Sequence, residues 1–362
     1  MRAVLLLRIA ALAVLASANP AIAHESSVAA GTTFAAADRI VRDEMQKQRI
    51  PGVALVILRD GKVIHQAGFG AADLEQNLSV RPDTAFNVGS LSKQFVAEGV
   101  LLLARDGKIA LDAPVSRYLS DAPASWSGIT VRHLLSHTSG LIREAPGFDG
   151  DKVQSDADVI RSAYAIPLNA PPGTRFEYCN LGYFILAEII TRTSGKPWPA
   201  FFAERVFGPA GMTATRPTSL TDLIPHRARG YEWNAGRFEN ALSFRALRPS
   251  GAFTSTAADL ARWEAVLARG GLSDGAARAE MWRPARLANG ETAPYGFGWR
   301  IETVDGQTEI GHGGSLPGFR SYYARYPHAK LAIIVLTNNG AAERRDIARG
   351  IARTMFQPGP AS

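Results

Sequence analysis

Strand-like segments gather near the two ends of this 362-residue chain, and helical patterns fill the part between them. Near the beginning, G-V-A-L-V-I-L (52–58) and V-I-H-Q-A-G-F-G (63–70) flank the turn R-D-G-K, which is typical of a β-hairpin. Near the end, strand-length runs lie between glycine, proline and aspartate residues; they span 295–303, 308–312, 319–326 and 331–337. We therefore expect an α/β (α+β) architecture in which one antiparallel sheet, built from both chain ends, is flanked by helices.

The middle of the chain, about residues 108–240, shows few strand signals. Its helical patterns lie at 131–137, 181–192 and 201–207. We expect a mostly helical subdomain here, inserted into a sheet subdomain that is made of about residues 34–107 and 241–357.

Further helices are expected beside the sheet. One amphipathic pattern covers residues 34–49, and another helix is expected over 346–356. Thr256 is the expected N-cap of a third helix, because Asp259 follows three residues later, as in a capping box.

The first residues have the pattern of a bacterial secretory signal peptide. Two arginines bracket a short apolar start, a ten-residue apolar run covers 9–18, and P-A-I-A (20–23) ends in an A-x-A cleavage signal. The apolar run is too short to span a bilayer. We expect a signal peptide over residues 1–23, and a single periplasmic or secreted domain over 24–362 without stable membrane insertion.

Composition narrows the function classes. Lys and Arg number 40 against 33 Asp and Glu, but the basic residues are scattered, so nucleic acid is not an expected partner. Cys179 is the only cysteine, so no internal disulfide can form. The sequence has no H-E-x-x-H pattern or Cys/His cluster, so we expect no metal and no cofactor. It also has no G-x-S-x-G, which argues against an α/β-hydrolase nucleophile turn.

The stretch N-V-G-S-L-S-K-Q-F (87–95) has two interpretations. Ser90 could be a nucleophile, because serine needs a base within hydrogen-bond reach and Lys93 lies one helical turn away. The apolar helix that follows would bury Lys93 and lower its pKa, and the helix N-terminus would suit a developing oxyanion. Alternatively, Ser90 caps a helix and Lys93 is solvated. This stretch alone does not decide between the two.

Two more polar clusters stand out. Tyr178-Cys179-Asn180 precedes the strong helical pattern at 181; it is either functional or a helix cap by Asn180 beside a packed Tyr178. The segment G-H-G-G-S-L-P-G-F-R-S (311–321) leads into a strand. In a functional interpretation, its paired glycines would let the backbone approach a ligand closely, and His312 could donate a proton. Alternatively, the segment is only a tight hairpin loop.

Together, the three clusters resemble the serine penicillin-recognising hydrolases, which include class C β-lactamases, D-alanyl-D-alanine carboxypeptidases, D-aminopeptidases and related esterases. The family reads S-x-x-K, then Y-x-N, then K/H-x-G. This chain has the three motifs in that order, as Ser90-Leu91-Ser92-Lys93, Tyr178-Cys179-Asn180 and His312-Gly313-Gly314. Three further segments, at 134–141, 207–213 and 254–261, also look like sequences of this family. The resemblance therefore covers about residues 34–357. It implies a β-lactamase/transpeptidase-like fold.

The resemblance implies a role for each matching residue. Ser90 would be acylated, and Lys93 and Tyr178 would share the proton transfers as general base and acid. Asn180 would hold the substrate amide. The backbone N–H groups of Ser90 and Ser315 would form the oxyanion hole.

One departure from the family pattern affects the expected activity. His312, followed by Gly313 and Gly314, stands where class C β-lactamases carry lysine, and an imidazole holds a carboxylate less firmly than an ammonium. Arg300 lies where carboxypeptidases of this family place a carboxylate-binding arginine. The two histidines His133 and His137 are expected to pack or cap rather than to catalyse.

We therefore expect a secreted serine hydrolase that acts through an acyl-enzyme on amide or ester bonds. The favoured activities are D-Ala-D-Ala carboxypeptidase, D-aminopeptidase or esterase, on a small molecule or a short peptide such as one from the cell wall. The alternatives are a class C-like β-lactamase and a penicillin-binding or sensing module without turnover. Loops near 140–175 and 215–250 should set the choice of acyl group.

Overall fold

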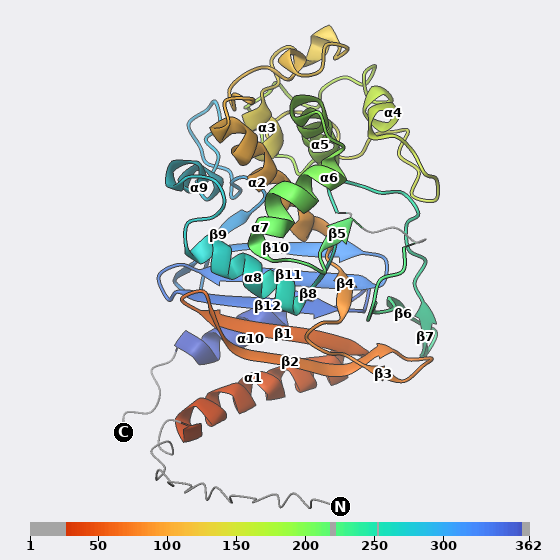
Figure 1. Ribbon diagram of the computed structural model, residues 1–362, viewed down its shortest axis with the longest axis vertical. Helices are drawn as coiled ribbons and strands as arrows, with labels where there is room; N and C mark the ends of the chain where they lie inside the picture. Colours follow the sequence, from red (N-terminus) through yellow and green to blue (C-terminus); the bar gives the residue numbers. More distant parts are fainter. Residues whose placement is uncertain (1–26, 218–221, 252, 357–362) are drawn as a thin grey trace, which may run out of the picture.

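A seven-stranded antiparallel sheet forms the lower half of the computed structural model, which describes residues 27–217, 222–251 and 253–356 (Figure 1). In spatial order the strands are β3 (Leu78–Ser79), β2 (Lys62–Asp73), β1 (Gly52–Arg59), β12 (Leu331–Thr337), β11 (Phe319–Tyr326), β10 (Gln307–Leu316) and β9 (Arg300–Val304). In the central pair, β1 from the start of the chain lies beside β12 from its end, with Val53 opposite Thr337. The predicted sheet built from both chain ends is confirmed.

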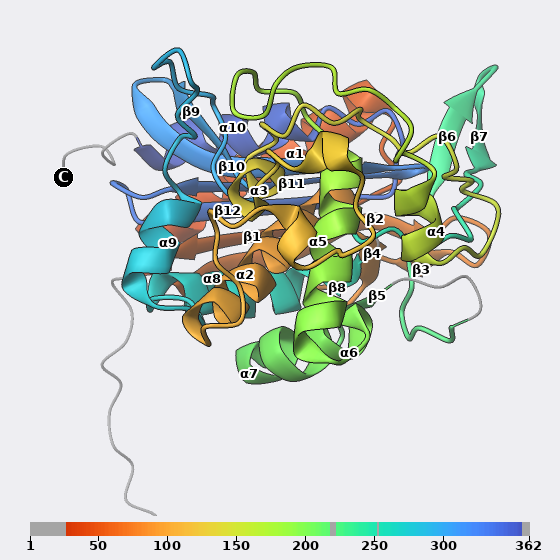
Figure 2. The same ribbon diagram turned by 90° about the horizontal axis from the view of Figure 1, so that it is seen from above.

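The sheet is buried on both faces, which explains why β1 and β12 are continuous apolar runs. Alternate residues of β1 enter two different cores: Val56 faces the larger core, and Leu55 faces the smaller one. Helices α1 (Ser27–Gln48) and α10 (Arg344–Phe356) cover the smaller core, and α8 (Ala257–Ala268) packs on the other face (Figures 1 and 2). The expected cap of α8 is present, since Thr256 Oγ1 accepts a hydrogen bond from the Asp259 N–H at 3.0 Å.

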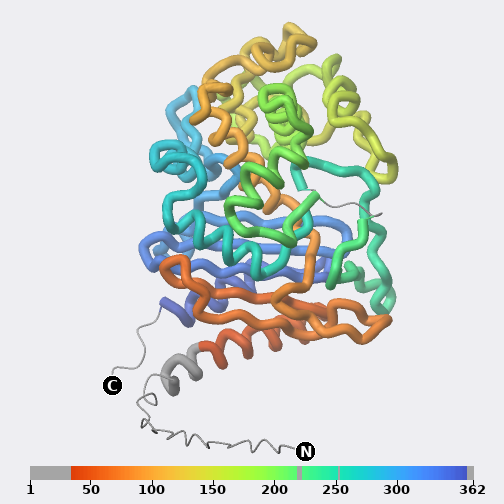
Figure 3. The backbone as a smooth tube through the Cα atoms, viewed as in Figure 1, coloured from red at the N-terminus to blue at the C-terminus, as the bar shows by residue number. Residues whose placement is uncertain are grey.

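The helical part lies above the sheet and is centred on α2 (Ser92–Arg105) and α5 (Asn180–Ser194), which pack on each other (Figures 2 and 3). A short 3₁₀ turn, η1 (Gly89–Leu91), precedes α2. The expected burial of this helix is confirmed, because every residue from Ser92 to Leu103 is buried. The other helical elements are η2 (Val115–Arg117), η3 (Ala124–Trp126), α3 (Val131–Leu135), α4 (Asp156–Arg161), α6 (Trp198–Phe202), a π-helical turn η4 (Ala203–Phe207), α7 (Gly208–Ala210) and α9 (Gly275–Met281).

The expectation of few strands between 108 and 240 is wrong for the last part of that range. A two-stranded hairpin is formed there by β6 (Tyr231–Asn234) and β7 (Arg237–Asn240). Its turn takes positive φ at Ala235 and Gly236, and the Trp233 and Phe238 rings pack 4.8 Å apart across it. A small sheet joins β5 (Arg216–Pro217), β8 (Phe253–Thr256) and β4 (Ala85–Asn87). The proposed boundaries between the two subdomains stay a prediction.

The strand expected over 295–303 begins only at Arg300. Gly298 takes a positive φ of 78°, which ends any extended run. A Cβ at this position would lie 2.7 Å from the Lys93 carbonyl oxygen, so the loop packs tightly on α2.

The predicted signal peptide, residues 1–23, lies outside the described residues. Among the residues that are described, no helix is both long enough and apolar enough to cross a membrane.

Candidate active site

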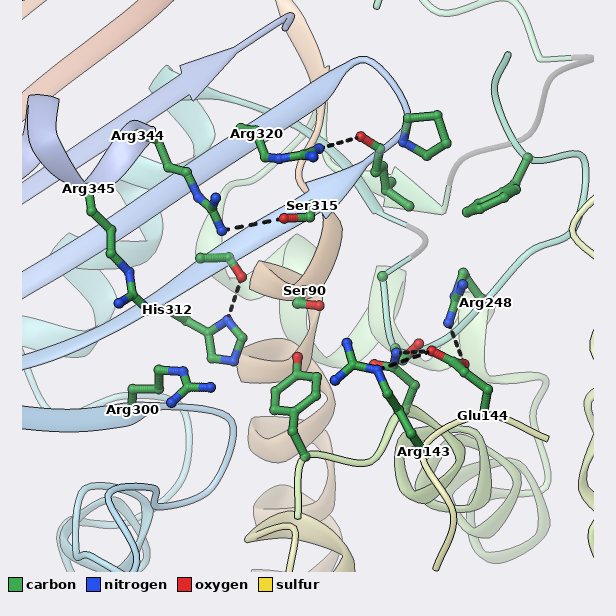
Figure 4. Close-up of a pocket in the computed structure, with 18 of the residues that line it drawn as sticks. Ser90, Arg143, Glu144, Arg248, Arg300, His312, Ser315, Arg320, Arg344 and Arg345 are labelled. Carbon is green, nitrogen blue, oxygen red and sulfur yellow. Dashed lines mark hydrogen bonds and ion pairs between the residues drawn. The ribbon is translucent and has the colours of Figure 1, made fainter. Parts of the chain in front are cut away.

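Ser90 and Lys93 lie at the junction of η1 and α2, directly after the tight turn at Gly89. Gly89 has a positive φ of 55°, and Ser90 lines the pocket drawn in Figure 4. The capping interpretation of Ser90 is wrong, because neither η1 nor α2 has a side-chain cap. The nearby Ser92 is fully buried and donates from its hydroxyl to the Gly89 carbonyl at 2.6 Å, so it holds the turn.

Lys93 is wholly buried, and its Nζ has three oxygen partners. It lies 3.1 Å from Ser90 Oγ, 2.8 Å from Asn180 Oδ1 and 2.8 Å from the Ser250 carbonyl oxygen. Burial lowers the pKa of Lys93 well below its ordinary value, and the positive charge of Arg248 adds to this. A neutral amine has two N–H groups and one lone pair. The two carbonyl oxygens can only accept, so they take both N–H groups and the lone pair is left for the Ser90 hydroxyl.

Tyr178 places a neutral phenol beside the Ser90 hydroxyl. Burial raises its pKa to about 12, although a hydrogen bond with the Ser90 side chain and the charges of Arg143 and Arg300 act in the opposite direction. The Nζ of Lys93 lies 4.9 Å from the centre of the Tyr178 ring. A phenol of this pKa keeps its proton at neutral pH and can donate it to a developing negative charge.

Asn180 begins α5, but the cap of this helix is Cys179, whose Sγ accepts a hydrogen bond from the Gly182 N–H. The capping interpretation of Asn180 is therefore wrong. Its Oδ1 accepts from Lys93, and its Nδ2 donates to Glu144 Oε1. Because both ends of the amide are engaged, Asn180 orients Lys93 as well as lining the pocket.

Glu144 and two arginines support this amide. The carboxylate of Glu144 pairs with Arg248 at 2.8 Å and lies 3.9 Å from Arg143. Sequence analysis missed Glu144, Arg248 and Ser250, because they belong to loops without a motif and reach the site only through the fold.

The glycines of β10 bring its backbone against η1. A Cβ at Gly314 would lie 1.9 Å from the Val88 carbonyl oxygen, and a Cβ at Gly89 would lie 2.6 Å from the Ser315 backbone nitrogen. The expected close approach therefore exists, although it is made to the protein's own turn. It brings the backbone of Ser315 beside that of Ser90, where an oxyanion hole would need both N–H groups.

His312 is largely buried at the wall of the pocket, and both of its ring nitrogens have partners. Nδ1 lies 2.8 Å from the Gly313 carbonyl oxygen, which can only accept, so Nδ1 carries the proton. Nε2 then accepts from the Tyr295 hydroxyl at 2.8 Å. Burial lowers the pKa of His312 well below its ordinary value, and whenever Lys93 is protonated its charge acts in the same direction. The imidazole is neutral and has no free donor for a carboxylate.

His137 holds the segment that carries Tyr178. Its backbone has a positive φ of 59°, and its carbonyl accepts from the Glu177 N–H at 2.9 Å. Its ring packs against the Tyr178 ring with centroids 4.3 Å apart. His137 therefore packs, as expected. His133 caps, as also expected, since its Nδ1 accepts from the Thr130 N–H in a capping box.

The pocket around Ser90 has a volume of about 600 Å³ and is strongly basic. Six arginines face two glutamates, an excess of four positive charges; they are Arg143, Arg248, Arg300, Arg320, Arg344 and Arg345, with Glu144 and Glu232. Arg300, singled out from the sequence, lies 6.0 Å from the Tyr178 ring centre. Figure 4 shows Ser90 between two groups, with Arg143, Arg248 and Glu144 on one side and Arg300, His312, Arg344 and Arg345 on the other. In the described ranges, no group of three His, Cys, Asp or Glu side chains could hold a metal ion.

Known proteins share this sequence and this fold. Residues 37–355 match the family model described as Beta-lactamase. Penicillin-binding protein 4* of Bacillus subtilis is 29% identical over 81% of this chain and 69% of its own length. A D-aminopeptidase of Cereibacter sphaeroides is also 29% identical, over 86% of this chain, which spans only 61% of that relative. An octameric penicillin-binding protein homologue from Pyrococcus abyssi superposes with a TM-score of 0.78 at 25% identity, covering 89% of this chain and 77% of the other.

Proposed function

Because the chain belongs to the beta-lactamase family of serine hydrolases, we propose that it hydrolyses amide or ester bonds through an acyl-enzyme on Ser90. The observation that carries this proposal is the buried Nζ of Lys93, which lies 3.1 Å from Ser90 Oγ and 2.8 Å from each of two carbonyl oxygens that can take the N–H groups of a neutral amine. Such an amine has its lone pair available for the hydroxyl proton of serine.

Acylation follows from the two pKa shifts. Lys93, kept neutral by burial, takes the hydroxyl proton as Ser90 Oγ forms a bond to the substrate carbonyl carbon. The N–H groups of Ser90 and Ser315 stabilise the oxyanion. Tyr178, whose pKa is about 12, gives its proton to the leaving nitrogen or oxygen as the scissile bond breaks.

Deacylation returns both protons. A water molecule loses a proton to the Tyr178 phenolate as its oxygen bonds to the acyl carbon. Ser90 Oγ then leaves and recovers its proton from the Lys93 ammonium. Both groups end in their starting states, and one water has been consumed.

The charge of the pocket supports a choice among the activities of the relatives. An aminopeptidase must bind a free ammonium next to the scissile bond, and an excess of four positive charges repels one. A carboxypeptidase or an esterase of acidic compounds binds a carboxylate there, which the same charges attract. We therefore favour a carboxypeptidase-like or esterase activity over a D-aminopeptidase activity.

The β-lactamase alternative is less favoured, because the neutral His312 supplies no cation where class C enzymes carry lysine. Nitrocefin hydrolysis as fast as ester hydrolysis would restore it. A binding module without turnover would be acylated once and release no product.

The proposal is tested with a fluorophosphonate probe and with multiple-turnover hydrolysis of a simple aryl ester. Ser90→Ala should abolish labelling and turnover, whereas Ser92→Ala should keep the label. Equal labelling of Ser90→Ala and the native protein would refute the proposal, and a single burst without turnover would favour the binding module.

A further inference from the structure

Four arginines of the pocket form no ion pair among the described residues. One of them, Arg320, is held instead by the backbone carbonyls of Leu316 and Phe319. Arg300, Arg344 and Arg345 form no ion pair there, and the only hydrogen bond of the three is a long one of 3.4 Å, from Arg344 Nη2 to Ser315 Oγ. The other arginines of α10 differ. Arg349 pairs with Glu302 and Glu309, and Arg353 pairs with Asp305.

The position of Arg344 and Arg345 is unfavourable for the protein alone. Both lie in the first turn of α10, where the helix dipole disfavours cations. Arg344 is partly buried, and its Nε is buried without a hydrogen-bond partner. Burial, and then the charge of Arg320, lower the pKa of Arg344, while the charge of the adjacent Glu343 acts in the opposite direction. An arrangement that costs stability in the free protein is typical of a binding site.

The chain also makes room for Arg344. A Cβ at Gly313 would lie 2.8 Å from Arg344 Nη2, so the guanidinium crosses β10 where that strand has no side chain. This places it beside Ser315, whose backbone nitrogen lies against the turn that carries Ser90. An anion bound to Arg344 would therefore sit close to the scissile bond.

We propose that Arg300, Arg344 and Arg345 form an anion subsite that selects substrates with two or more carboxylates beside the scissile bond. This inference rests on the proposed function and deepens it. A single carboxylate can engage one guanidinium in a bidentate pair and leaves the others unpaired. The three side chains also come from different elements, β9 and α10, and lie around His312 rather than at one point (Figure 4). That spacing fits two separate carboxylates better than one compact phosphate.

The side of the pocket with Arg143 and Arg248 is less suited to binding the carboxylates of the substrate. Arg143 and Arg248 already share Glu144, which also holds the Asn180 amide. A carboxylate bound there would compete with Glu144 and release the amide that orients Lys93.

The test compares kcat/KM within two matched pairs of esters. In the first pair, an acetate ester has a phenol leaving group with 3,5-dicarboxylate or with 3,5-dicarboxamide substituents. In the second pair, a 4-nitrophenyl ester has a benzoyl group with two further carboxylates or two carboxamides. We expect the kcat/KM of the dianion to exceed that of its matched neutral diamide about tenfold or more in at least one pair, because hydrogen bonds between a guanidinium and a carboxylate are stronger than those to a neutral amide. The ratio should fall as salt is raised.

Variants then assign the preference to the subsite. The dianion-to-diamide ratio should collapse to about one in the double variant Arg344→Gln/Arg345→Gln. The control Arg353→Gln removes an arginine from the same helix outside the pocket and should keep the ratio. A native ratio near one in both pairs, or a ratio that survives the double variant, overturns the inference. If the neutral diamides are still hydrolysed in a Ser90-dependent way, the proposed function stands; if no ester is turned over, the proposed function itself fails.

Discussion

The Nδ1 of His137 accepts a hydrogen bond from the backbone N–H of Cys179 at 3.1 Å. The carbonyl of His137 accepts from the Glu177 N–H, so one residue fixes the backbone on both sides of Tyr178. His137→Ala should therefore lower kcat by about 10–100-fold with little change in KM, because a misplaced acid costs rate even when substrate binding survives. His137→Asn should recover part of the loss, since Asn tolerates positive φ and offers an acceptor.

A control for His137 lies four residues earlier. His133→Ala removes a capping histidine from the same segment and should lower the melting temperature without a matching fall in kcat. If the two alanine variants lose kcat in proportion to stability, the positioning role of His137 is wrong.

The acid limb of the pH profile should belong to Lys93. Its lowered pKa means that the neutral, active form gains population as pH rises through that value, so kcat/KM should rise with pH and reach a plateau well below the ordinary lysine pKa. Lys93→Arg stays protonated and should lose about 10³-fold in kcat/KM. Because His312 is also buried with a lowered pKa, the profile of His312→Gln is the check. Loss of the acid limb in that variant would assign it to the imidazole.

Tyr178→Phe should separate substrates by their leaving group. An amide nitrogen must be protonated to leave, so amide hydrolysis should fall by about 10²-fold or more. A 4-nitrophenolate leaves without a proton, so acylation by its ester should fall much less, which a burst measurement with stopped-flow absorbance would detect. Equal losses for acylation by both substrates would contradict a role of Tyr178 as the acid.

One buried ion pair should matter for stability rather than activity. Arg325 Nε, from β11, lies 2.7 Å from Glu264 Oε2, from α8, and both side chains are buried between this helix and the sheet. Arg325→Met would leave the Glu264 carboxylate buried without its cation and should lower the free energy of unfolding by about 3–5 kcal/mol in urea titration. Arg237→Gln, which removes the exposed pair with Glu239, should change it by less than about 1 kcal/mol.

The sequence predicted the elements and residues whose signals are local. The strands β11 and β12 match their predicted ranges, because short apolar runs between turn residues need no distant information. Ser90 and Lys93 are three residues apart, so one helical turn was enough to propose their contact. The second partners of Lys93 were not predictable in this way, since the Ser250 carbonyl reaches it through packing of a loop.

The difference between local signals and contacts made only in the fold also explains why the role of Arg344 and the position of the His312 ring were not predicted. The hairpin of β6 and β7 is a separate case. Arg344 follows the last strand, β12, and it comes beside Ser315 of β10 only because both strands pair with β11. His312 was expected to bind the substrate, which stays a prediction; it lines the pocket, and its ring is held by Tyr295, a residue whose backbone was expected to be a strand. The hairpin of β6 and β7 had a signal, the Asn-Ala-Gly turn between aromatic residues, that sequence analysis did not use.

The pairing of β1 with β12 also governs the order in which this protein can fold. Val53 needs Thr337 as its neighbour, so the centre of the sheet cannot close until nearly the whole chain is available. Contacts of such long sequence separation are typical of slow folding. The turn with Ser90 would be made early, but the strand carrying Ser315 arrives late, and a chain caught between the two stages would have its nucleophile without the wall that stabilises the oxyanion. Hydrolytic activity would therefore appear only with the last strands, which makes it a direct measure of completed folding.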